Sequence, residues 1–206
     1  MTTCNICGYE GEFLSYRDKP SRKCPECGSL ERHRNFFKYI KKNDLLTNKR
    51  ILHIAPETQL SELVRKKSEK YYCLDQTPNK IYISKDDLTD LNVFKDNTFD
   101  IVICFHVLEH IVNDTKALLE IKRVLRPNGL AFICVPLKEK STYIWTEEDI
   151  NEQKKDGKWG ITGKFEGHYR TYGGVEFPFL LKKCFREINF SNNKKMTGAD
   201  FFICKK

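Results

Sequence analysis

Four cysteines near the N-terminus have the residue type and spacing of a metal site. Cys4 and Cys7 form one Cys-x-x-Cys turn, and Cys24 and Cys27 form a second. A two-residue gap lets both thiolates of a turn bind one ion, and two turns complete the tetrahedral shell of Zn²⁺. Because protein then fills all four positions, the spacing predicts a structural zinc site. The alternatives are two redox-active cysteine pairs or free thiols.

A second group of reactive side chains lies in one loop near the middle of the chain. The loop 106–110 contains two histidines and a glutamate and follows the apolar run 99–104. A helical pattern over 114–125 and a second apolar run over 130–135 come next, which predicts a βαβ unit in a parallel sheet. Ligands bind such sheets at the carboxyl ends of the strands, so we expect this loop to face a ligand.

The segment before this unit has the order of a nucleotide-binding half. The apolar run 49–55 is followed by a turn, a helical pattern over 61–69 and a strand pattern over 70–74 that ends at Asp75. In such halves, backbone N–H groups of the first turn approach the nucleotide, and an acid after the second strand accepts the ribose hydroxyls. A weaker strand pattern precedes Asp87, which either faces an adenine amino group or forms a turn.

Composition predicts one ordinary domain with a small appendage. The chain has 206 residues, 40% of them hydrophobic, and a formal net charge of +8. The charge permits an acidic partner, but Lys and Arg are scattered among acids, which favours a solvated surface. No apolar run is long enough to cross a bilayer, and the N-terminus lacks a signal-peptide pattern. We expect a cytoplasmic protein without membrane insertion, and nothing in the sequence determines its oligomeric state.

A helical pattern follows the second cysteine turn, with Ser29 as the expected N-cap. His33 lies among the apolar residues of this helix, which recur at helical spacing up to Ile40. Arg32 and Arg34 beside it predict either an anion-binding rim or a solvated face, and the solvated face is favoured.

The central motifs resemble those of class I S-adenosylmethionine-dependent methyltransferases. In that family Phe99-Asp100 starts the fourth strand, Leu108-Glu109-His110 opens the next helix, and the turn RVLRPNG at 123–129 precedes the fifth strand. The patterns CPECGSLERHR and HIAPE are similar to a subgroup of small methyltransferases with an N-terminal zinc ribbon. The resemblance implies an α/β fold with a Rossmann-like, seven-stranded, mostly parallel sheet, an antiparallel C-terminal strand and a small N-terminal zinc ribbon.

The resemblance also implies which residues bind S-adenosylmethionine. The first loop of the family reads acid-x-Gly-x-Gly-x-Gly, and residues 53–59 occupy that place without a glycine. Asp75 matches the ribose-binding acid, and Asp87-Leu88 match the adenine-contacting pair. The expected cofactor contacts are His53, Ala55, Pro56, Glu57, Asp75, Gln76, Asp87, Leu88, Phe105 and His106.

The chemistry requires few catalytic groups, because a sulfonium methyl is already activated. Catalysis then needs in-line positioning, and a base when the acceptor is a hydroxyl or a protonated amine. His106 is the first candidate for that base, and its alternative role is packing near the ligand. Glu109 and His110 are expected to open the following helix and support the loop.

The segment 137–174, called the lid segment here, leaves the strand and helix periods and is rich in aromatic residues, charges and glycine. A connection of this length predicts a partly ordered lid that selects the substrate. We expect Trp145, His168, Tyr169 and Arg170 to contact the acceptor, with His168 as a second base and Arg170 as an anion contact. The alternative is that His168 and Arg170 tie the lid to the domain surface.

Two functions are compatible with these patterns. The first is methyl transfer to an oxygen or nitrogen of a small, sugar-containing or anionic acceptor. In this interpretation, residues 1–42 form a zinc ribbon with its following helix, and residues 49–206 form the methyltransferase domain. The second is a zinc-ribbon nucleic-acid-binding protein with a degenerate, non-catalytic methyltransferase-like domain. The missing glycines and the positive charge motivate the second function.

Overall fold

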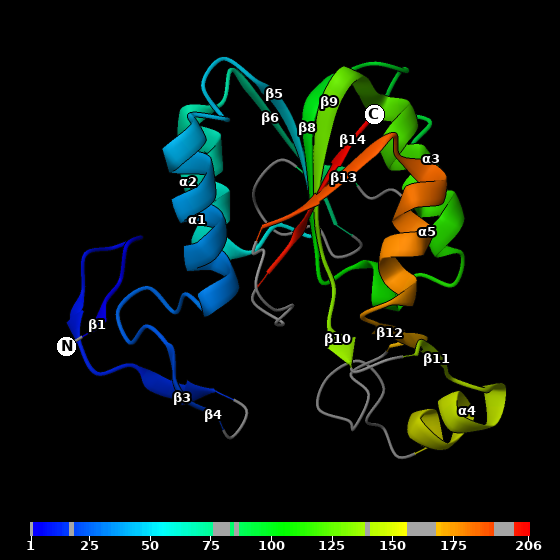
Figure 1. Ribbon diagram of the computed structural model, residues 1–206, viewed down its shortest axis with the longest axis horizontal. Coiled ribbons are helices and arrows are strands. Elements are labelled where there is room, and N and C mark those ends of the chain that lie inside the picture. Colours follow the sequence, from blue (N-terminus) through cyan, green and yellow to red (C-terminus); the bar gives the residue numbers. More distant parts are fainter. Residues whose placement is uncertain are drawn as a thin grey trace.

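A central sheet covered by helices on both faces forms the body of the molecule (Figure 1). The computed structural model describes residues 2–16, 19–75, 83–84, 87–138, 141–155, 168–191 and 200–206. Helices α1 (Glu31–Asn43) and α2 (Thr58–Lys67) cover one face, and α3 (Asp114–Val124) and α5 (Glu176–Cys184) cover the other. None of the helices in the described ranges is long and apolar enough to cross a membrane.

The central sheet has seven strands in the order β13-β14-β9-β8-β5-β6-β7. Only β14 runs antiparallel to its neighbours, which confirms the predicted α/β sheet with an antiparallel C-terminal strand. The strands are β5 (Arg50–Ile54), β6 (Lys70–Leu74), β7 (Ile83–Ser84), β8 (Phe99–Phe105), β9 (Leu125–Cys134), β13 (Glu187–Phe190) and β14 (Phe202–Lys205).

The hydrophobic core lies on both faces of the sheet, which explains why the central strands are apolar throughout. Val102 and Cys104 pack toward α3 and α5, whereas Ile101 and Ile103 pack toward α1 and α2. Helix α3 contributes its apolar stripe, whose members are fully buried: Ala117, Leu118, Ile121 and Val124. Helical periodicity and two-sided burial therefore produce the layers that the sequence predicts.

Two short hairpins form the N-terminal segment, called the cysteine module here (residues 2–16 and 19–29). Strand β1 (Thr2–Thr3) pairs with β2 (Glu10–Gly11), and β3 (Leu14–Tyr16) pairs with β4 (Lys19–Lys23). Gly8 and Gly28 follow the two cysteine turns with φ of 83° and 68°, a conformation that glycine adopts without strain. Helix α1 begins at Glu31 with Leu30 at the N-cap, so the prediction of Ser29 as N-cap is wrong.

The polar loop after β8 differs from its prediction. Leu108–His110 form a separate 3₁₀ turn, and α3 begins only at Asp114, where Asn113 Oδ1 accepts a hydrogen bond from the Lys116 N–H at 3.0 Å. Glu109 and His110 therefore do not open the helix. Asn113 is the better N-cap because its side chain can satisfy a free backbone N–H of the first turn.

The lid segment is partly built into the body of the protein. Strands β10 (Leu137–Lys138), β12 (Arg170–Gly173) and β11 (Tyr143–Ile144) form a small sheet, and α4 (Glu147–Lys155) follows β11. All four residues of β12 are buried, and one of them, Tyr172, packs into the main core. The segment predicted as a partly ordered lid therefore has strands near both of its ends. Residues 139–140 and 156–167 of the lid segment lie outside the described residues.

Candidate functional site

A cavity of about 260 Å³ lies where the chain reverses its direction of strand addition. From β5 the chain adds β6 and β7 on one side and then crosses back to add β8 and β9 on the other. Ligands of open α/β sheets bind at this switch point, beyond the carboxyl ends of the strands. The cavity is lined by Ile54, Ala55, Leu74, Asp75, Leu88, His106, Val107, His110 and Ile111.

The backbone turns sharply at two positions of this cavity. Ala55, directly after β5, has φ of 45°, and His106, directly after β8, has φ of 55°. A left-handed conformation costs a non-glycine residue roughly 1–2 kcal/mol, so the surrounding structure must hold it in place. The N–H of Ala55 donates to Leu74 O at 2.7 Å, and the N–H of His106 donates to Cys134 O at 2.8 Å. Ala55 thus takes a left-handed conformation that glycine adopts without strain.

His106 is held by contacts on both ring nitrogens. Nδ1 lies 3.3 Å from Glu109 Oε1, and Nε2 lies 3.6 Å from Cys134 Sγ. Burial raises the pKa of the Cys134 thiol, which donates to Asp200 O at 3.2 Å and stays neutral. In the tautomer with the proton on Nδ1, that N–H is on the side of the Glu109 carboxylate and Nε2 is the accepting nitrogen.

Four of the ten predicted cofactor contacts line the cavity: Ala55, Asp75, Leu88 and His106. Phe105 instead packs its ring edge-on against Phe36 of α1, with centroids 5.0 Å apart. Asp87 is exposed, and its Oδ1 accepts the Thr89 N–H at 2.8 Å, which is the turn alternative. Pro56 is not among the lining residues, and Gln76 lies outside the described residues.

Glu57 does not face the cavity, because α1 binds its carboxylate. Arg32 Nε donates to Glu57 Oε1 at 3.0 Å, a second guanidinium nitrogen pairs with the same oxygen, and His33 Nε2 lies 2.8 Å from it. His33 Nδ1 accepts the Leu30 N–H at 3.1 Å, so Nε2 carries the proton that faces Glu57. Burial raises the pKa of Glu57, but the hydrogen bond from His33 and the charge of Arg32 outweigh it and lower the pKa to about 2.

This contact corrects two expectations at once. Glu57 stands where the family's loop has a glycine. Its side chain links α1 to the first turn and is not a cofactor contact. Arg32 is neither solvated nor free to bind an anion. Arg34 is also engaged: it donates to Ser29 O at 2.6 Å and to Arg22 O at 3.1 Å, which braces the cysteine module.

His53 lies inside the sheet and not in the cavity. It is fully buried on β5, and its Nδ1 lies 2.8 Å from the Tyr71 hydroxyl. Burial lowers the pKa of His53 from 6.5 to about 4, so the folded protein keeps this imidazole neutral at pH values where the unfolded chain protonates it.

Acidification is expected to destabilise the protein through His53. Between its folded and unfolded pKa values the unfolded state binds the extra proton, so the free energy of unfolding falls as the pH falls below about 6.5. From pH 7.5 to pH 5 this loss amounts to about 2 kcal/mol. Urea unfolding at both pH values measures it. The His53→Gln variant should lack this part of the pH dependence, and an equal pH dependence in both proteins would contradict the assignment.

The structure gives different roles to the residues that were predicted to contact the acceptor. The Arg170 guanidinium pairs with Asp114 and donates to Val112 O at 2.5 Å, so the prediction of Arg170 as an anion contact is wrong. Tyr169 donates its N–H to Glu109 O at 2.8 Å, and Trp145 donates its N–H to Tyr169 O at 2.9 Å. Arg170 therefore ties the lid segment to the body, which is its alternative role, and the Tyr169 N–H adds a second link. His168 lies against His110, with ring centroids 4.7 Å apart.

The sequence missed His110 as a cavity residue. It was expected only to support the loop, yet its side chain lines the cavity beside His106. His110 is the last residue of the 3₁₀ turn Leu108–His110 and does not belong to a longer helix. The available signal was a pair of histidines, His106 and His110, four positions apart in a loop at the carboxyl end of a strand.

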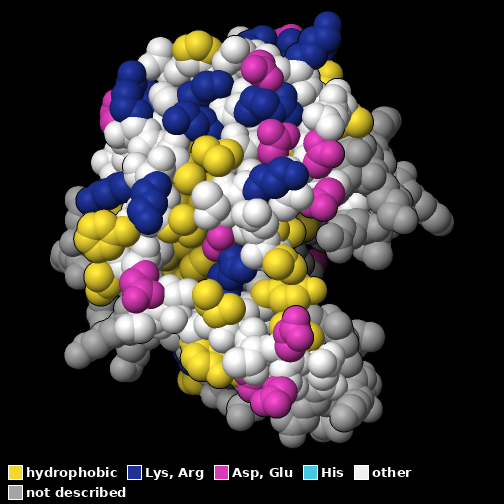
Figure 2. Space-filling view, turned by 90° about the vertical axis from the view of Figure 1, so that its right-hand side faces the viewer, with side chains coloured by type: hydrophobic (Ala, Val, Ile, Leu, Met, Phe, Trp, Pro, Cys, Tyr) yellow, Lys and Arg dark blue, Asp and Glu magenta, His cyan; other side chains and the backbone are white. Residues whose placement is uncertain are grey.

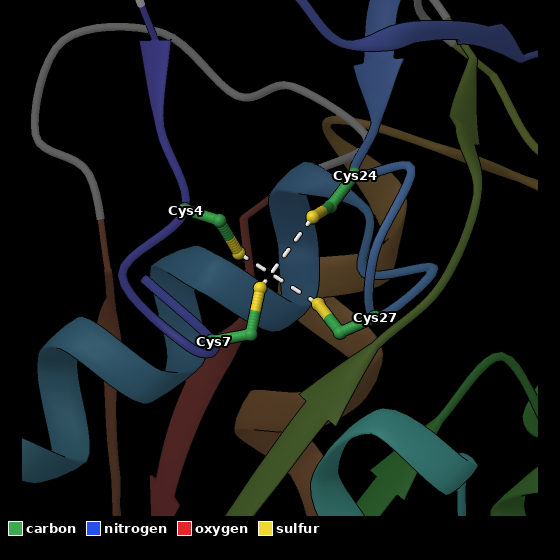
Figure 3. A group of neighbouring side chains, drawn as sticks. All are labelled: Cys4, Cys7, Cys24 and Cys27. Carbon is green, nitrogen blue, oxygen red and sulfur yellow. Dashed lines mark hydrogen bonds between the residues drawn. The ribbon is translucent and has the colours of Figure 1, made fainter. Parts of the chain in front are cut away.

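The four cysteines of the cysteine module point to one centre (Figure 3). Cys4 Sγ lies 3.7 Å from Cys27 Sγ, and Cys7 Sγ lies 3.6 Å from Cys24 Sγ. With Zn–S bonds of about 2.3 Å, the edge of a tetrahedral shell is about 3.8 Å, so donor set and spacing both fit Zn²⁺. The buried Ser29 hydroxyl lies 3.4 Å and 3.2 Å from the sulfurs of Cys4 and Cys27, where it can support the thiolates.

Comparisons with known proteins match the centre of the chain. Residues 36–133 match the family model described as Methyltransferase domain. A stretch of 61 residues is 48% identical to an uncharacterized protein of Methanocaldococcus jannaschii, covering 30% of this chain and 25% of that protein. A stretch of 72 residues is 32% identical to the ubiquinone biosynthesis O-methyltransferase of Rickettsia typhi, covering 32% of this chain and 29% of that enzyme. The matched stretches thus span less than a third of these curated relatives.

Solved structures match over most of the chain. A SAM-dependent methyltransferase from Archaeoglobus fulgidus has a TM-score of 0.58 at 13% identity, covering 84% of this chain and 94% of that one. The 1,6-didemethyltoxoflavin-N1-methyltransferase of Burkholderia thailandensis, solved with S-adenosylhomocysteine, has a TM-score of 0.60 at 12% identity, covering 85% and 76%. The chain therefore has the fold of the class I S-adenosylmethionine-dependent methyltransferases, with a methyltransferase-domain match over its central part.

Proposed function

We propose that the chain transfers a methyl group from S-adenosylmethionine to an oxygen or nitrogen atom of a small acceptor. The observation that carries this proposal is the cavity at the switch point, which combines apolar walls with the carboxylate of Asp75 at the end of β6. This is the position at which an acid accepts ribose hydroxyls in dinucleotide folds. The Rickettsia relative is an O-methyltransferase by name, which favours oxygen as the methylated atom.

The lining residues divide into parts that suit the parts of the cofactor. The Asp75 carboxylate would accept the two ribose hydroxyls, and the apolar Leu88 and Ile111 would enclose the adenine. The small side chain of Ala55 would let the first turn approach the methionine part. When bound, S-adenosylmethionine supplies a methyl group on a positively charged sulfur, so no further activation of the methyl group is needed.

The protein's own chemical task is then to orient the acceptor and accept a proton. His106 lines the cavity, its Nδ1 lies 3.3 Å from Glu109 Oε1, and its Nε2 lies 3.6 Å from the Cys134 thiol. A carboxylate behind an imidazole fixes its tautomer and stabilises its protonated form. We assign the role of general base to His106 Nε2 when the acceptor is a hydroxyl or a protonated amine.

The nucleic-acid alternative rests on the formal net charge of +8 and on the glycine-free first loop. Arg32 and Arg34 are both engaged within the chain. On the face over α3 and α5, Lys and Arg side chains are interspersed with acidic and apolar ones rather than gathered in one field (Figure 2). The glycine-free loop, the other motive, keeps a left-handed turn at Ala55. We therefore favour methyl transfer to a small acceptor.

We also propose that the cysteine module binds one structural Zn²⁺ through Cys4, Cys7, Cys24 and Cys27. The sulfur spacing and the two glycine-terminated turns support this assignment. A module with a core of few residues gains its stability from the metal.

Calorimetric titration with S-adenosylhomocysteine tests the assignment of Asp75. We expect Asp75→Asn to weaken binding at least tenfold, because a neutral amide replaces a charged acceptor of two hydroxyl hydrogen bonds. The matched control is Asp44→Asn, at the end of α1 and far from the cavity, which should bind within about twofold of the unmodified protein. Equal affinity of the Asp75→Asn variant would remove Asp75 from the site.

A further inference from the structure

Three side chains of metal-ligating type meet at the mouth of the cavity. Glu109 and His110 come from the 3₁₀ turn after β8, and His168 comes from the end of the lid segment. One ligand atom from each lies within 4.8 Å of the others, and the two imidazole rings meet edge to face at 82°. His110 also lines the cavity, so this His–Glu cluster adjoins the space assigned to the cofactor.

The carboxylate of Glu109 points independently to a positively charged ligand. The residue is only 1% exposed, and within the described part of the chain neither of its oxygens accepts a hydrogen bond of good geometry. A basic nitrogen beside it is His106 Nδ1, at 3.3 Å from Oε1. Burying an ionised carboxylate is costly unless it is paired, hydrogen-bonded or bound to a metal.

Backbone and side-chain contacts hold the two halves of the cluster together. The N–H of Tyr169 donates to Glu109 O at 2.8 Å, directly beside His168. The Tyr172 hydroxyl donates to Leu108 O at 3.2 Å, and Arg170 donates to Val112 O at 2.5 Å. These three links fix the lid end against the 3₁₀ turn on both sides of the cluster. Such supporting contacts are what a metal site needs to keep its ligands in place.

We propose that Glu109, His110 and His168 bind one divalent cation beside the cofactor cavity, separate from the zinc of the cysteine module. One carboxylate and two imidazoles suit divalent first-row metals and leave coordination positions open for a substrate. In a bound shell the ligand atoms lie about 3–3.5 Å apart, and here they lie within 4.8 Å of one another.

A cation at this position indicates which class of acceptor the site binds. This role of the cation rests on the proposed function. An open position would bind the hydroxyl oxygen of the acceptor and lower the pKa of that hydroxyl. The hydroxyl proton leaves to solvent, and an oxygen lone pair forms the new C–O bond. The C–S bond of the sulfonium breaks with its electron pair going to sulfur. The products are a methyl ether, S-adenosylhomocysteine and a proton, so the inferred acceptors are metal-chelating alcohols or phenols.

Manganese titration followed by electron paramagnetic resonance tests the site on the full chain. Mn²⁺ is the probe because it prefers oxygen and nitrogen donors to the thiolates of the cysteine module, whose zinc is kept in place and checked by elemental analysis. We expect one Mn²⁺ per chain, with binding weakened at least tenfold in His168→Ala and in Glu109→Gln. The control Glu62→Gln, which removes an exposed carboxylate on α2, should leave binding unchanged.

Two variants keep the test decisive if one fails to fold. His168→Ala removes a partly exposed side chain, and circular dichroism establishes that each variant is folded before titration. The absence of Mn²⁺ binding, or binding that both variants leave intact, would overturn the inference. Titration with S-adenosylhomocysteine on the same samples separates this failure from a failure of the proposed function. Cofactor binding without Mn²⁺ refutes only the cation site.

Discussion

Changing Cys24 to serine is expected to release the zinc from the cysteine module and to unfold that module. The module's buried side chains are few, chiefly Cys4, Phe13 and Cys24, so little apolar burial remains once the metal is lost. Structural zinc in small modules contributes about 10–16 kcal/mol of binding free energy, and losing one thiolate forfeits a large part of it. Elemental analysis should find about one zinc per chain in the unmodified protein and almost none in the variant.

The control for this variant is Cys73→Ser, which changes a buried lone cysteine on β6 by the same atom. It should keep its zinc while losing some stability, because it places a hydroxyl in an apolar site. A Cys24→Ser protein that retains stoichiometric zinc, or an unmodified protein that folds its N-terminal segment without metal, would contradict the assignment.

Changing Glu57 to alanine is expected to lower the free energy of unfolding by about 2–4 kcal/mol. The substitution leaves Arg32 and His33 without the carboxylate that both contact, and their side chains are 19% and 3% exposed. Removing one partner of a largely buried pair costs more than an exposed ion pair does, because the remaining charge stays desolvated. Urea unfolding at neutral pH measures the loss, with the m-value checked for a constant two-state slope.

Two control measurements test whether the stability loss of Glu57→Ala comes from the contacts of its carboxylate with α1. Glu62→Gln breaks the exposed pair with Lys66 on α2 and should change stability by less than about 0.5 kcal/mol. Folded Glu57→Ala protein should bind S-adenosylhomocysteine within about threefold of the unmodified protein, since the carboxylate is turned away from the cavity. A stable variant that has lost cofactor affinity would place Glu57 in the site after all.

The layers of the fold follow from local pattern. The βαβ unit predicted over 99–135 is present, because two-sided burial makes its strands continuously apolar and one-sided burial gives the helix a 3.6-residue stripe. Its second strand begins at Leu125, so the prediction of a turn at 127–129 before that strand is wrong. The cysteine turns are correct because a short spacing and a following glycine determine the local conformation.

The site is less accessible to sequence reasoning because its contacts join distant segments. Glu57 lies 25 positions from Arg32, and no periodicity connects a loop acid with a helix of another module. His168 meets His110 across 58 positions, through a lid that has no repeating pattern. The local conformation also differs from its prediction, since His110 lines the cavity from a 3₁₀ turn and not from the start of the following helix.

The central claim is that the switch-point cavity binds the methyl donor through a glycine-free loop. Calorimetric titration of the unmodified, zinc-loaded protein with S-adenosylhomocysteine tests it most directly, because this product shares the adenosine that Asp75, Leu88 and Ile111 are assigned to hold. We predict saturable binding of one molecule per chain at micromolar concentrations. No binding at millimolar ligand would contradict the claim.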